Sequence, residues 1–190
     1  MISNTSDLSN PSQEGDEQKC WFVMRDLKRP NAKLPAYKQL EEEQCEVFTP
    51  LKWVLKIKNG KRIREKVPFI QDLLFVHGKK SEIDAIVKGI PTLQFRYQKG
   101  AYLKPMIVRD SDMNRFIHAV SVSENPKYYH PEEITPNMYG RTVQIIGGSL
   151  NGYRGILLTT RGSKTKRLLV ELPNFFSVGV EVKSDYIELL

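Results

Sequence analysis

A glycine-rich segment near the C-terminus, residues 140–156, constrains the fold more than any other part of the sequence. Val143 and Ile145 alternate with polar residues, which is the pattern of a strand with one buried face. A glycine-rich turn over residues 147–152 follows, where glycine accepts the positive φ angles of a tight turn. Gly155 then opens a second apolar run, and a glycine at the head of a strand allows two backbones to approach closely. The segment therefore predicts a strand–turn–strand unit.

The charge is distributed unevenly along the chain. Lys and Arg number 29 against 22 Asp and Glu, a net charge of +7 over 190 residues. Residues 1–18 contain four acids and no base, which leaves a net charge of +11 for residues 19–190. The polar composition of residues 1–18 predicts a disordered acidic tail. A basic body favours polyanionic partners, but the same charge also keeps a protein soluble, so charge alone does not decide between the two.

Several classes of protein are not supported by the sequence. No apolar stretch approaches the ~20 residues of a membrane-spanning helix, and a secretory signal is missing, so we expect a cytoplasmic protein with no membrane partner. Cys20 and Cys45 are expected to be buried free thiols in a reducing compartment, with a disulfide between them as the alternative. The three histidines lack metal-ligand spacing. With no nucleophile–base motif, phosphate loop or carboxylate pair, we expect no catalytic residue, cofactor or metal, and hence no enzyme.

Residues 19–122 predict a first domain of mixed strands and helices. The dipeptide Asn59-Gly60 is the strongest hairpin signal, because both central residues of such a turn need positive φ. An order of this kind predicts an α+β fold, a mostly antiparallel sheet with helices packed on it. The expected strands are 20–25, 47–57, a return strand from residue 61, 72–77 and 93–97, and the expected helices are 33–44, 80–88 and 110–122.

Residues 123–138 hold three prolines and little apolar content, which predicts a linker. We expect a small five-stranded β-barrel over residues 139–190. Its strands are placed at about 141–146, 154–161, 165–172, 176–183 and 185–189.

The glycine-rich segment resembles the KOW motif of ribosomal proteins and NusG-type transcription factors. The match rests on five positions, Val143, Ile145, Gly148, Gly152 and Gly155. The rest of the chain resembles the NusG family in order and spacing. Trp21-Phe-Val resembles its opening strand, Phe48-Thr-Pro50 its Val/Ala-x-Pro, Phe69–Val76 its central strand, and the segment from Gly89 to Pro105 its Gly-Val…Phe-Val-Arg-Phe-Gly…Pro.

One departure concerns the central strand. Where the family usually has Phe-Pro-Gly-Tyr, this chain has Ile70-Gln71-Asp72-Leu73. The difference favours a specialised paralogue, of the RfaH type or of the kind that antiterminates capsular polysaccharide operons.

The resemblance implies a binding patch for the β′ clamp helices of RNA polymerase. By position it comprises Ile70, Leu73 and Phe75, with Arg25 at its margin. The alternative is that the three apolar residues belong to the core. Alternation places Leu73 and Phe75 on one face of the strand, opposite Leu74 and Val76, so one face can be core while the other binds.

The resemblance also implies contacts with upstream DNA or the non-template strand. From Lys52 to Lys66 the hairpin carries seven bases against Glu65 alone, and neutralising phosphates would release counterions. The alternative is a charged hairpin that resists edge pairing. The candidate nucleic-acid-binding residues are Lys56, Lys58, Lys61, Arg62 and Arg64 in the hairpin, and Lys28, Arg29 and Lys33 near the first helix.

In the KOW domain, Leu150 and Tyr153 lie in the loop where relatives present apolar residues to Rho or to a ribosomal protein. The alternative is that Tyr153 caps the barrel core. Phe176 neighbours Phe175 on an expected strand, so one of the two should be exposed, and Phe176 is the candidate partner residue. The function implied is a monomeric, nucleoid-associated elongation or antitermination factor. A ribosome-associated or general RNA-binding KOW protein is the alternative.

Overall fold

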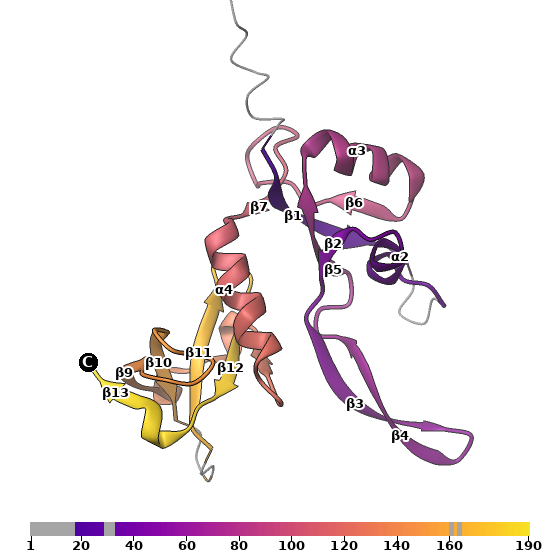
Figure 1. Cartoon of the computed structure of the whole chain (residues 1–190). Helices are drawn as coiled ribbons and strands as arrows, with labels where there is room; N and C mark the ends of the chain where they lie inside the picture. Colours follow the sequence, from indigo (N-terminus) through magenta and orange to yellow (C-terminus); the bar gives the residue numbers. More distant parts are fainter. Residues whose placement is uncertain (1–17, 29–32, 160–161, 163–164) are drawn as a thin grey trace, which may run out of the picture. The chain divides into compact units, whose positions relative to one another are not determined.

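The computed structural model describes residues 18–28, 33–159, 162 and 165–190 (Figure 1). The predicted acidic tail therefore lies, apart from Gln18, outside the described residues. Contacts divide the chain into two compact units. The described residues up to Phe48, together with Asp72–Val108, form the first unit, and Thr49–Gln71 with Arg109–Leu190 form the second unit.

The first unit is an antiparallel sheet with two helices. Strand β5 lies between β2 and β1, β6 follows β1, and β7 also pairs with β1. All of these pairings are antiparallel, which confirms the expected α+β class with an antiparallel sheet. The elements are β1 (Cys20–Asp26), α2 (Ala36–Glu42), β2 (Glu46–Phe48), β5 (Leu73–Gly78), α3 (Lys80–Gly89), β6 (Leu93–Phe95) and β7 (Ile107–Val108).

Both helices of the first unit contact the same face of the sheet. The Asp26 carboxylate accepts a hydrogen bond from the Ala36 amide at 2.7 Å, which fixes the start of α2. A side chain at Gly78 would meet Ile83 of α3 at 3.0 Å, so glycine allows α3 to pack closely on β5. Because Cys20 pairs with Gly78 and strand residues alternate, Asp26 and Gly78 project from one face. The other face of β1 and β5 carries Trp21 and Phe75, both buried.

The second unit contains a hairpin, one α-helix and a six-stranded antiparallel sheet (Figure 1). The order of the large sheet is β13-β9-β10-β11-β12-β8. The elements are β3 (Leu51–Lys58), β4 (Lys61–Pro68), α4 (Asp110–Ser121), β8 (Lys127–Tyr129), η1 (Pro131–Glu133), η2 (Pro136–Met138), β9 (Tyr139–Ile145), β10 (Arg154–Leu158), β11 (Arg167–Leu172), β12 (Phe176–Glu181), η3 (Ser184–Tyr186) and β13 (Ile187–Leu189).

The glycine-rich segment folds as the sequence predicts. Gly147, Gly148 and Gly152 all have positive φ, between +67° and +90°, in the turn between β9 and β10. A Cβ atom at Gly155 would lie 2.8 Å from the Leu169 carbonyl oxygen, so any side chain there would push β10 and β11 apart. The five strands expected in this region are all present.

The segment predicted as a linker, 123–138, contains a strand. Residues Lys127–Tyr129 form β8, which pairs with β12 through Tyr129↔Ser177 and Lys127↔Gly179. Tyr128 and Tyr129 are buried, and burial of aromatic surface accounts for the ordering of a short strand among prolines. Helix α4, expected within the first domain, contacts β11 and β12 and is grouped with the second unit.

An aromatic cluster joins four parts of the second unit. Phe176 of β12 contacts Phe116 of α4 edge-on at 5.3 Å between ring centroids. Phe69, just after β4, stacks on Tyr128 at 5.2 Å and on His130 at 4.6 Å, and it meets Phe176 edge-on. Burial raises the pKa of Tyr128 to about 12, against a smaller opposing effect of a backbone hydrogen bond with Leu51. Aromatic packing therefore holds α4, β8 and the base of the hairpin on the large sheet.

Candidate nucleic-acid interface and docking residues

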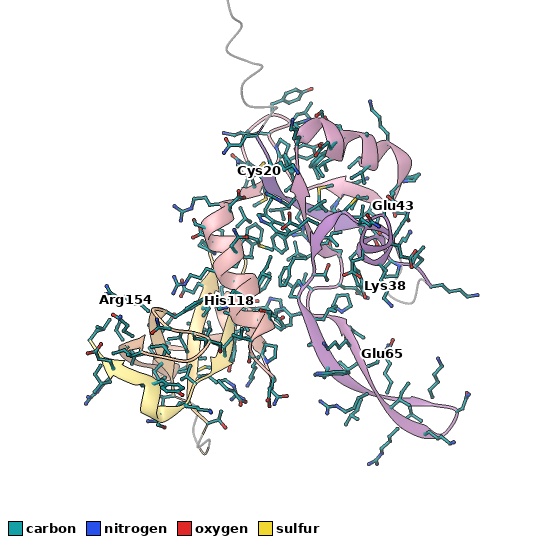
Figure 2. All side chains as sticks on the ribbon, in the orientation of Figure 1. Cys20, Lys38, Glu43, Glu65, His118 and Arg154 are labelled. Atoms are coloured by element: carbon teal, nitrogen blue, oxygen red, sulfur yellow. The ribbon has the colours of Figure 1, made fainter. Side chains whose placement is uncertain are left out.

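The β3–β4 hairpin forms as the dipeptide Asn59-Gly60 predicts. Both residues have positive φ, +51° and +73°, as a two-residue hairpin turn requires. The register is regular over the whole length, from Leu51↔Pro68 at the base to Lys58↔Lys61 beside the turn. Side chains project from both sides of the ribbon, Glu65 among them (Figure 2). The regular register therefore shows from which of the two faces of the hairpin each side chain projects.

The two faces of this ribbon differ in chemistry. Directly paired residues project from the same face of an antiparallel ladder. Face A carries an apolar row on β3 beside a basic row on β4, with the pairs Trp53↔Lys66, Leu55↔Arg64 and Ile57↔Arg62. Face B mixes bases, aliphatic residues and Glu65, and its pairs are Lys52↔Val67, Val54↔Glu65, Lys56↔Ile63 and Lys58↔Lys61.

The polar contacts follow this division. On face A, the Arg64 guanidinium and the Lys66 ammonium lie 5.0 Å and 5.1 Å from the Trp53 ring centroid, within cation–π range. On face B, the Lys56 ammonium pairs with the Glu65 carboxylate at 3.0 Å, where both side chains are half exposed. A pair this exposed contributes little to stability. Of the predicted nucleic-acid-binding residues in the hairpin, Arg62 and Arg64 therefore share face A, whereas Lys56, Lys58 and Lys61 lie on face B.

The apolar row on face A was missed by the reading of the sequence as a basic hairpin. Trp53, Leu55 and Ile57 are 47%, 73% and 77% exposed. The signal was present: apolar residues recur at every second position before Asn59-Gly60, and this turn fixes the register in which the basic row lies beside them.

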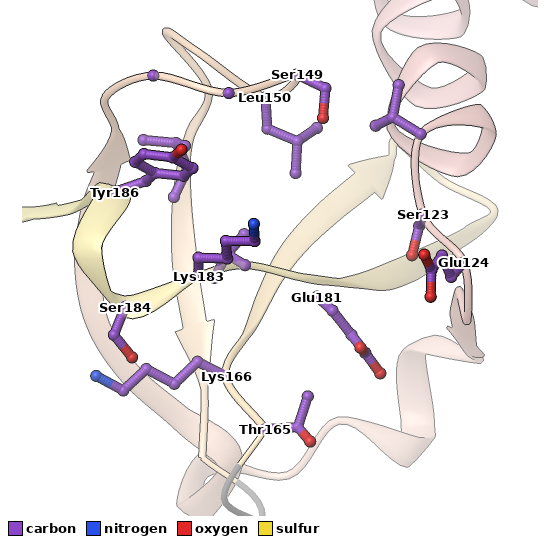
Figure 3. A pocket seen from close by; sticks show the side chains of 15 residues that line it. Ser123, Glu124, Ser149, Leu150, Thr165, Lys166, Glu181, Lys183, Ser184 and Tyr186 are labelled. Atoms are coloured by element: carbon purple, nitrogen blue, oxygen red, sulfur yellow. The ribbon is translucent and has the colours of Figure 1, made fainter.

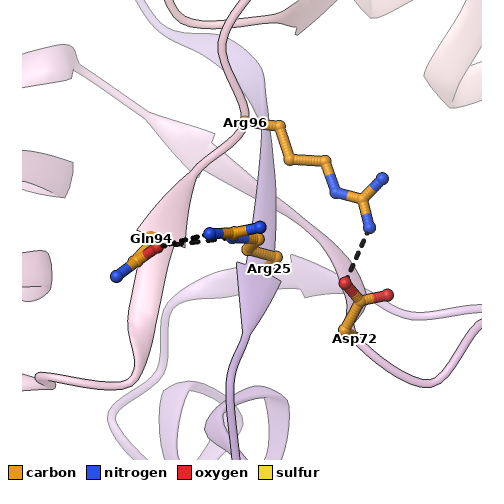
Figure 4. A network of polar contacts seen from close by, with 4 residues as sticks. All are labelled: Arg25, Asp72, Gln94 and Arg96. Carbon is orange, nitrogen blue, oxygen red and sulfur yellow. Dashed lines mark hydrogen bonds and ion pairs between the residues drawn. The ribbon is translucent and has the colours of Figure 1, made fainter.

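Around Arg25 the first unit carries a polar network at one end of its sheet (Figure 4). The Arg25 guanidinium donates to the Gln94 side-chain oxygen at 3.0 Å and 3.3 Å. Nearby, Arg96 pairs with the Asp72 carboxylate at 2.9 Å. Arg25 is exposed and lies in register with Leu73 on one side and Gln94 on the other, so the three residues share one face. This edge offers charged donors to a partner.

Leu73 and Phe75 are buried, as the alternative that places them in the core expects. Leu73 is 3% exposed and Phe75 is fully buried, with its ring 6.3 Å from that of Phe48. Strand β5 lies between β2 and β1 in the sheet, and Phe48 of β2 and Val23 of β1 are the residues in register with Phe75. Ile70, in the second unit, is half-buried. Of the four predicted polymerase-binding residues, Arg25 is the exposed one.

The predicted basic residues near α2 are only partly described. Lys28 is half-buried, and its ammonium donates to the Leu34 carbonyl oxygen at 2.9 Å. Lys33 is exposed. Arg29 lies outside the described residues. The structure therefore gives Lys28 a structural contact at the start of the helix.

In the C-terminal sheet, the predicted partner residues make contacts within the second unit. The Tyr153 hydroxyl donates to the Arg115 carbonyl oxygen of α4 at 2.9 Å, and His118 Nδ1 lies 2.9 Å from the same hydroxyl. Burial raises the pKa of Tyr153, against an opposing effect of the Arg115 charge. Leu150 is 6% exposed.

The expectation that Phe176 is the exposed member of its pair is wrong. Phe176 is 2% exposed in the aromatic cluster, whereas the neighbouring Phe175 is half-buried. Phe175 lies in the turn before β12, so strand alternation does not relate the two rings, and sequence alone did not say which face of β12 meets α4.

A pocket of about 740 Å³ lies in the second unit, between the segment after α4 and the C-terminal sheet. In Figure 3 the Leu150 side chain is directed into it. Its charged lining mixes both signs, with Glu124 and Glu181 beside Lys166 and Lys183. This balance selects no class of ligand.

Across the described part of the chain, acids, histidines and cysteines form no group of three that could hold a metal ion. Within the same residues, every helix is too short or too polar to span a membrane. Cys20 and Cys45 are half-buried, not buried as expected, and burial followed by the nearby Glu43 carboxylate raises the pKa of Cys45.

Comparison with known proteins places this geometry in a family. No curated protein sequence matches the chain. Among solved structures it is similar to the one described as "Domain interaction in Thermotoga maritima NusG", at 16% identity and a TM-score of 0.45, over 93% of this chain and 99% of that chain. The model of the family described as "Transcription termination factor nusG" matches residues 19–117. Because this match extends over more than half of the sequence and includes the sheet of the first unit and the entire hairpin, the chain belongs to the NusG family.

Proposed function

We propose that this protein is a transcription elongation or antitermination factor that binds RNA polymerase and favours processive elongation. The observation that carries the proposal is the family match over residues 19–117. NusG-family proteins are transcription factors and not enzymes. The basic hairpin and the β-sheet module at the C-terminus fit such a role, in which one part binds the polymerase, one meets nucleic acid and one recruits a further partner.

The first unit is proposed to dock on the clamp helices of the β′ subunit. Arg25 is the exposed candidate, held by Gln94 at the end of β1. The neighbouring Arg96 and Asp72 form an ion pair that is partly exposed, and both groups can exchange partners with a docking surface. Leu73 and Phe75 support this edge from within the sheet.

The hairpin is proposed to contact nucleic acid at the upstream edge of the transcription bubble. Its two strands carry seven bases and one acid, and each phosphate that a base neutralises releases a counterion. A factor that binds one polymerase state more tightly than another shifts the equilibrium only by that difference in affinity. Holding both the clamp and the upstream nucleic acid would stabilise the elongating state in this way.

The C-terminal sheet is proposed to recruit a second partner, such as Rho or a ribosomal protein. Tyr153 and Leu150 lie in or beside the glycine-rich turn that carries the KOW resemblance. Because the Tyr153 hydroxyl is bonded to α4, partner binding through this residue requires α4 to release it.

The test is capture of RNA polymerase from purified components by the full chain. We expect Arg25→Glu to lower the affinity at least about tenfold, since it replaces a donor with a repelling carboxylate. The matched control is Lys88→Glu, which changes the charge equally on an exposed residue of α3. Equal binding by both variants would remove the Arg25 edge from the interface. Failure of the unmodified chain to bind any polymerase, with retention on ribosomes or RNA, would replace the proposal with a ribosome-associated or general RNA-binding role.

A further inference from the structure

Face A of the hairpin combines two properties in separate rows. The β3 row presents Trp53, Leu55 and Ile57, which are all exposed. This is unusual because moving apolar side chains out of water lowers the free energy. The β4 row presents Arg62, Arg64 and Lys66, which are also exposed. Every residue of β3 and β4 is described, and on face A none of them is acidic. Face A of the hairpin therefore carries an apolar row and a basic row that lie side by side.

The spacing within each row is set by the strand itself. Side chains on one face recur every second residue, which is about 6.7 Å along an extended strand. Successive phosphates of an extended single strand of nucleic acid are separated by a similar distance. The three basic side chains of one row and the three apolar side chains of the other therefore match about three nucleotides. The phosphates of such a strand lie on one side of it and its nucleobases on the other.

We propose that face A binds single-stranded nucleic acid, with bases against Trp53, Leu55 and Ile57 and phosphates against Arg62, Arg64 and Lys66. The proposal rests on the proposed function and assigns a ligand class and a face to the hairpin. A base that stacks on Trp53 displaces a cation from the indole ring, and the released Arg64 or Lys66 pairs with the adjacent phosphate. Stacking of this kind tolerates any base, because every base has a π face.

A duplex would satisfy only half of this surface. In a duplex the faces of the bases are covered by their neighbours, so the basic row would find phosphates while the apolar row stayed in water. A single strand offers both groups at once. The row of three cations with no acid also disfavours a partner protein of average charge, whereas it complements a polyanion.

The experiment measures binding of the full chain to a short labelled oligothymidine and to a duplex of equal length, with tryptophan emission as the second readout. Trp21 is buried, so a ligand on the hairpin changes the emission of Trp53. We expect the oligothymidine to bind more tightly than the duplex and to quench this emission, and we expect Trp53→Phe to lose most of the spectral change. Trp53→Ala should weaken oligothymidine binding about tenfold and leave duplex binding nearly unchanged.

Two triple variants compare the faces at equal charge. Arg62→Gln with Arg64→Gln and Lys66→Gln removes the basic row of face A, and Lys52→Gln with Lys56→Gln and Lys58→Gln removes three bases from face B. We expect the face A variant to lower the single-strand affinity more than the duplex affinity, and to reduce the single-strand salt slope by about 2. The face B variant should weaken both ligands to a similar, smaller extent.

Each contrary result has a distinct meaning. Equal losses from both triple variants without quenching of Trp53 would overturn the assignment of face A while the proposed contact between hairpin and nucleic acid stands. Quenching by anionic phospholipid vesicles, or by polymerase free of nucleic acid, with none by oligothymidine, would overturn it in favour of a lipid surface or a protein. If neither triple variant changed the affinity for the single strand or the duplex, the proposed contact between hairpin and nucleic acid would fail too. The proposed binding of RNA polymerase would still stand or fall by the capture experiment.

Discussion

The strand pairs β1–β5 and β3–β4 are both regular antiparallel ladders with apolar residues at many positions, but they differ completely in burial. Leu73, Leu74, Phe75 and Val76 of β5 are at most 3% exposed. In β3, by contrast, Leu55 and Ile57 are more than 70% exposed. Strand β5 has a partner on each side within a five-stranded sheet, whereas β3 and β4 form a sheet of two.

The difference shows that the neighbours of a strand, more than its own hydrophobicity, decide whether its apolar residues form a core. A two-stranded ribbon has no second layer, and on its own it is at best marginally stable. Bases at alternate positions on both faces also keep the hairpin from packing against an apolar surface, because a buried charge needs a partner. Apolar residues on such a ribbon are available to a ligand, and those on β5 are not.

The largest expected effect comes from placing the same charge in both ladders. Leu73→Asp should destabilise the first unit by at least about 5 kcal/mol, since it buries a carboxylate without a partner. Leu55→Asp should change the free energy of unfolding by less than about 0.5 kcal/mol, because the side chain is exposed. Urea unfolding followed by Trp21 fluorescence in a Trp53→Phe background measures both. Similar midpoints for the two variants would mean that the two strands do not differ in how they tolerate a charge.

A smaller effect is expected at the start of β12 in the second unit, where Phe175 and Phe176 are neighbours. Phe176→Ala should cost about 3–5 kcal/mol, because it leaves a cavity against Phe116 and Phe69. Phe175→Ala is the matched control, and its cost should stay below about 1.5 kcal/mol because the side chain is half-buried. Thermal unfolding of both variants tests whether the aromatic cluster holds α4 on the sheet. The reverse order of stability would show that Phe175 is the buried member.

The pH dependence of the same cluster is expected to be smaller again. The pKa of Tyr128 rises from 10.0 to about 12 on folding. Its contribution is therefore fully present below pH 10 and is lost as the pH rises toward 12, about 3 kcal/mol in total. Tyr128→Phe removes the titrating group, so the variant should lose less stability than the parent between these pH values. Parallel curves of unfolding free energy against pH would contradict the raised pKa.

The smallest expected effect concerns the contact between the glycine-rich turn and α4. Tyr153→Phe removes the hydroxyl that donates to the Arg115 carbonyl oxygen, which should cost about 1 kcal/mol. The contact lies near the surface, so the cost stays at the lower end if water replaces the hydroxyl. Hydrogen exchange of the α4 amides should accelerate in the variant. Unchanged exchange would mean that the hydroxyl does not restrain the helix.

Local signals predicted much of the fold. Asn59-Gly60 specified a hairpin turn, and Gly147, Gly152 and Gly155 specified a turn and a close approach of strands, because each of these requirements is set by the backbone near the residue itself. Strand β8 was missed for the opposite reason. Lys127–Tyr129 pairs with β12, about 50 residues away, and nothing in its proline-containing surroundings indicates that partner.

The candidate site was predicted less completely than the fold. The bases of the hairpin were identified from composition, but Trp53, Leu55 and Ile57 were overlooked because apolar residues on a strand are usually read as core. At Leu73 and Phe75 the resemblance implied a docking role with the core as the alternative, and the core reading describes their burial. The strands and helices around β5 and β3 separate the two cases, and these surroundings are a property of the folded chain.

The length of the hairpin has one more consequence. Each strand has eight residues, so the turn at Asn59-Gly60 lies about 27 Å from the base. Since the base is anchored by Phe69 in an aromatic cluster, a small rotation there is amplified into a sweep of several ångströms at the tip. A hairpin of this kind acts as a lever, and the packing of Phe69 against three rings limits how far its tip can swing.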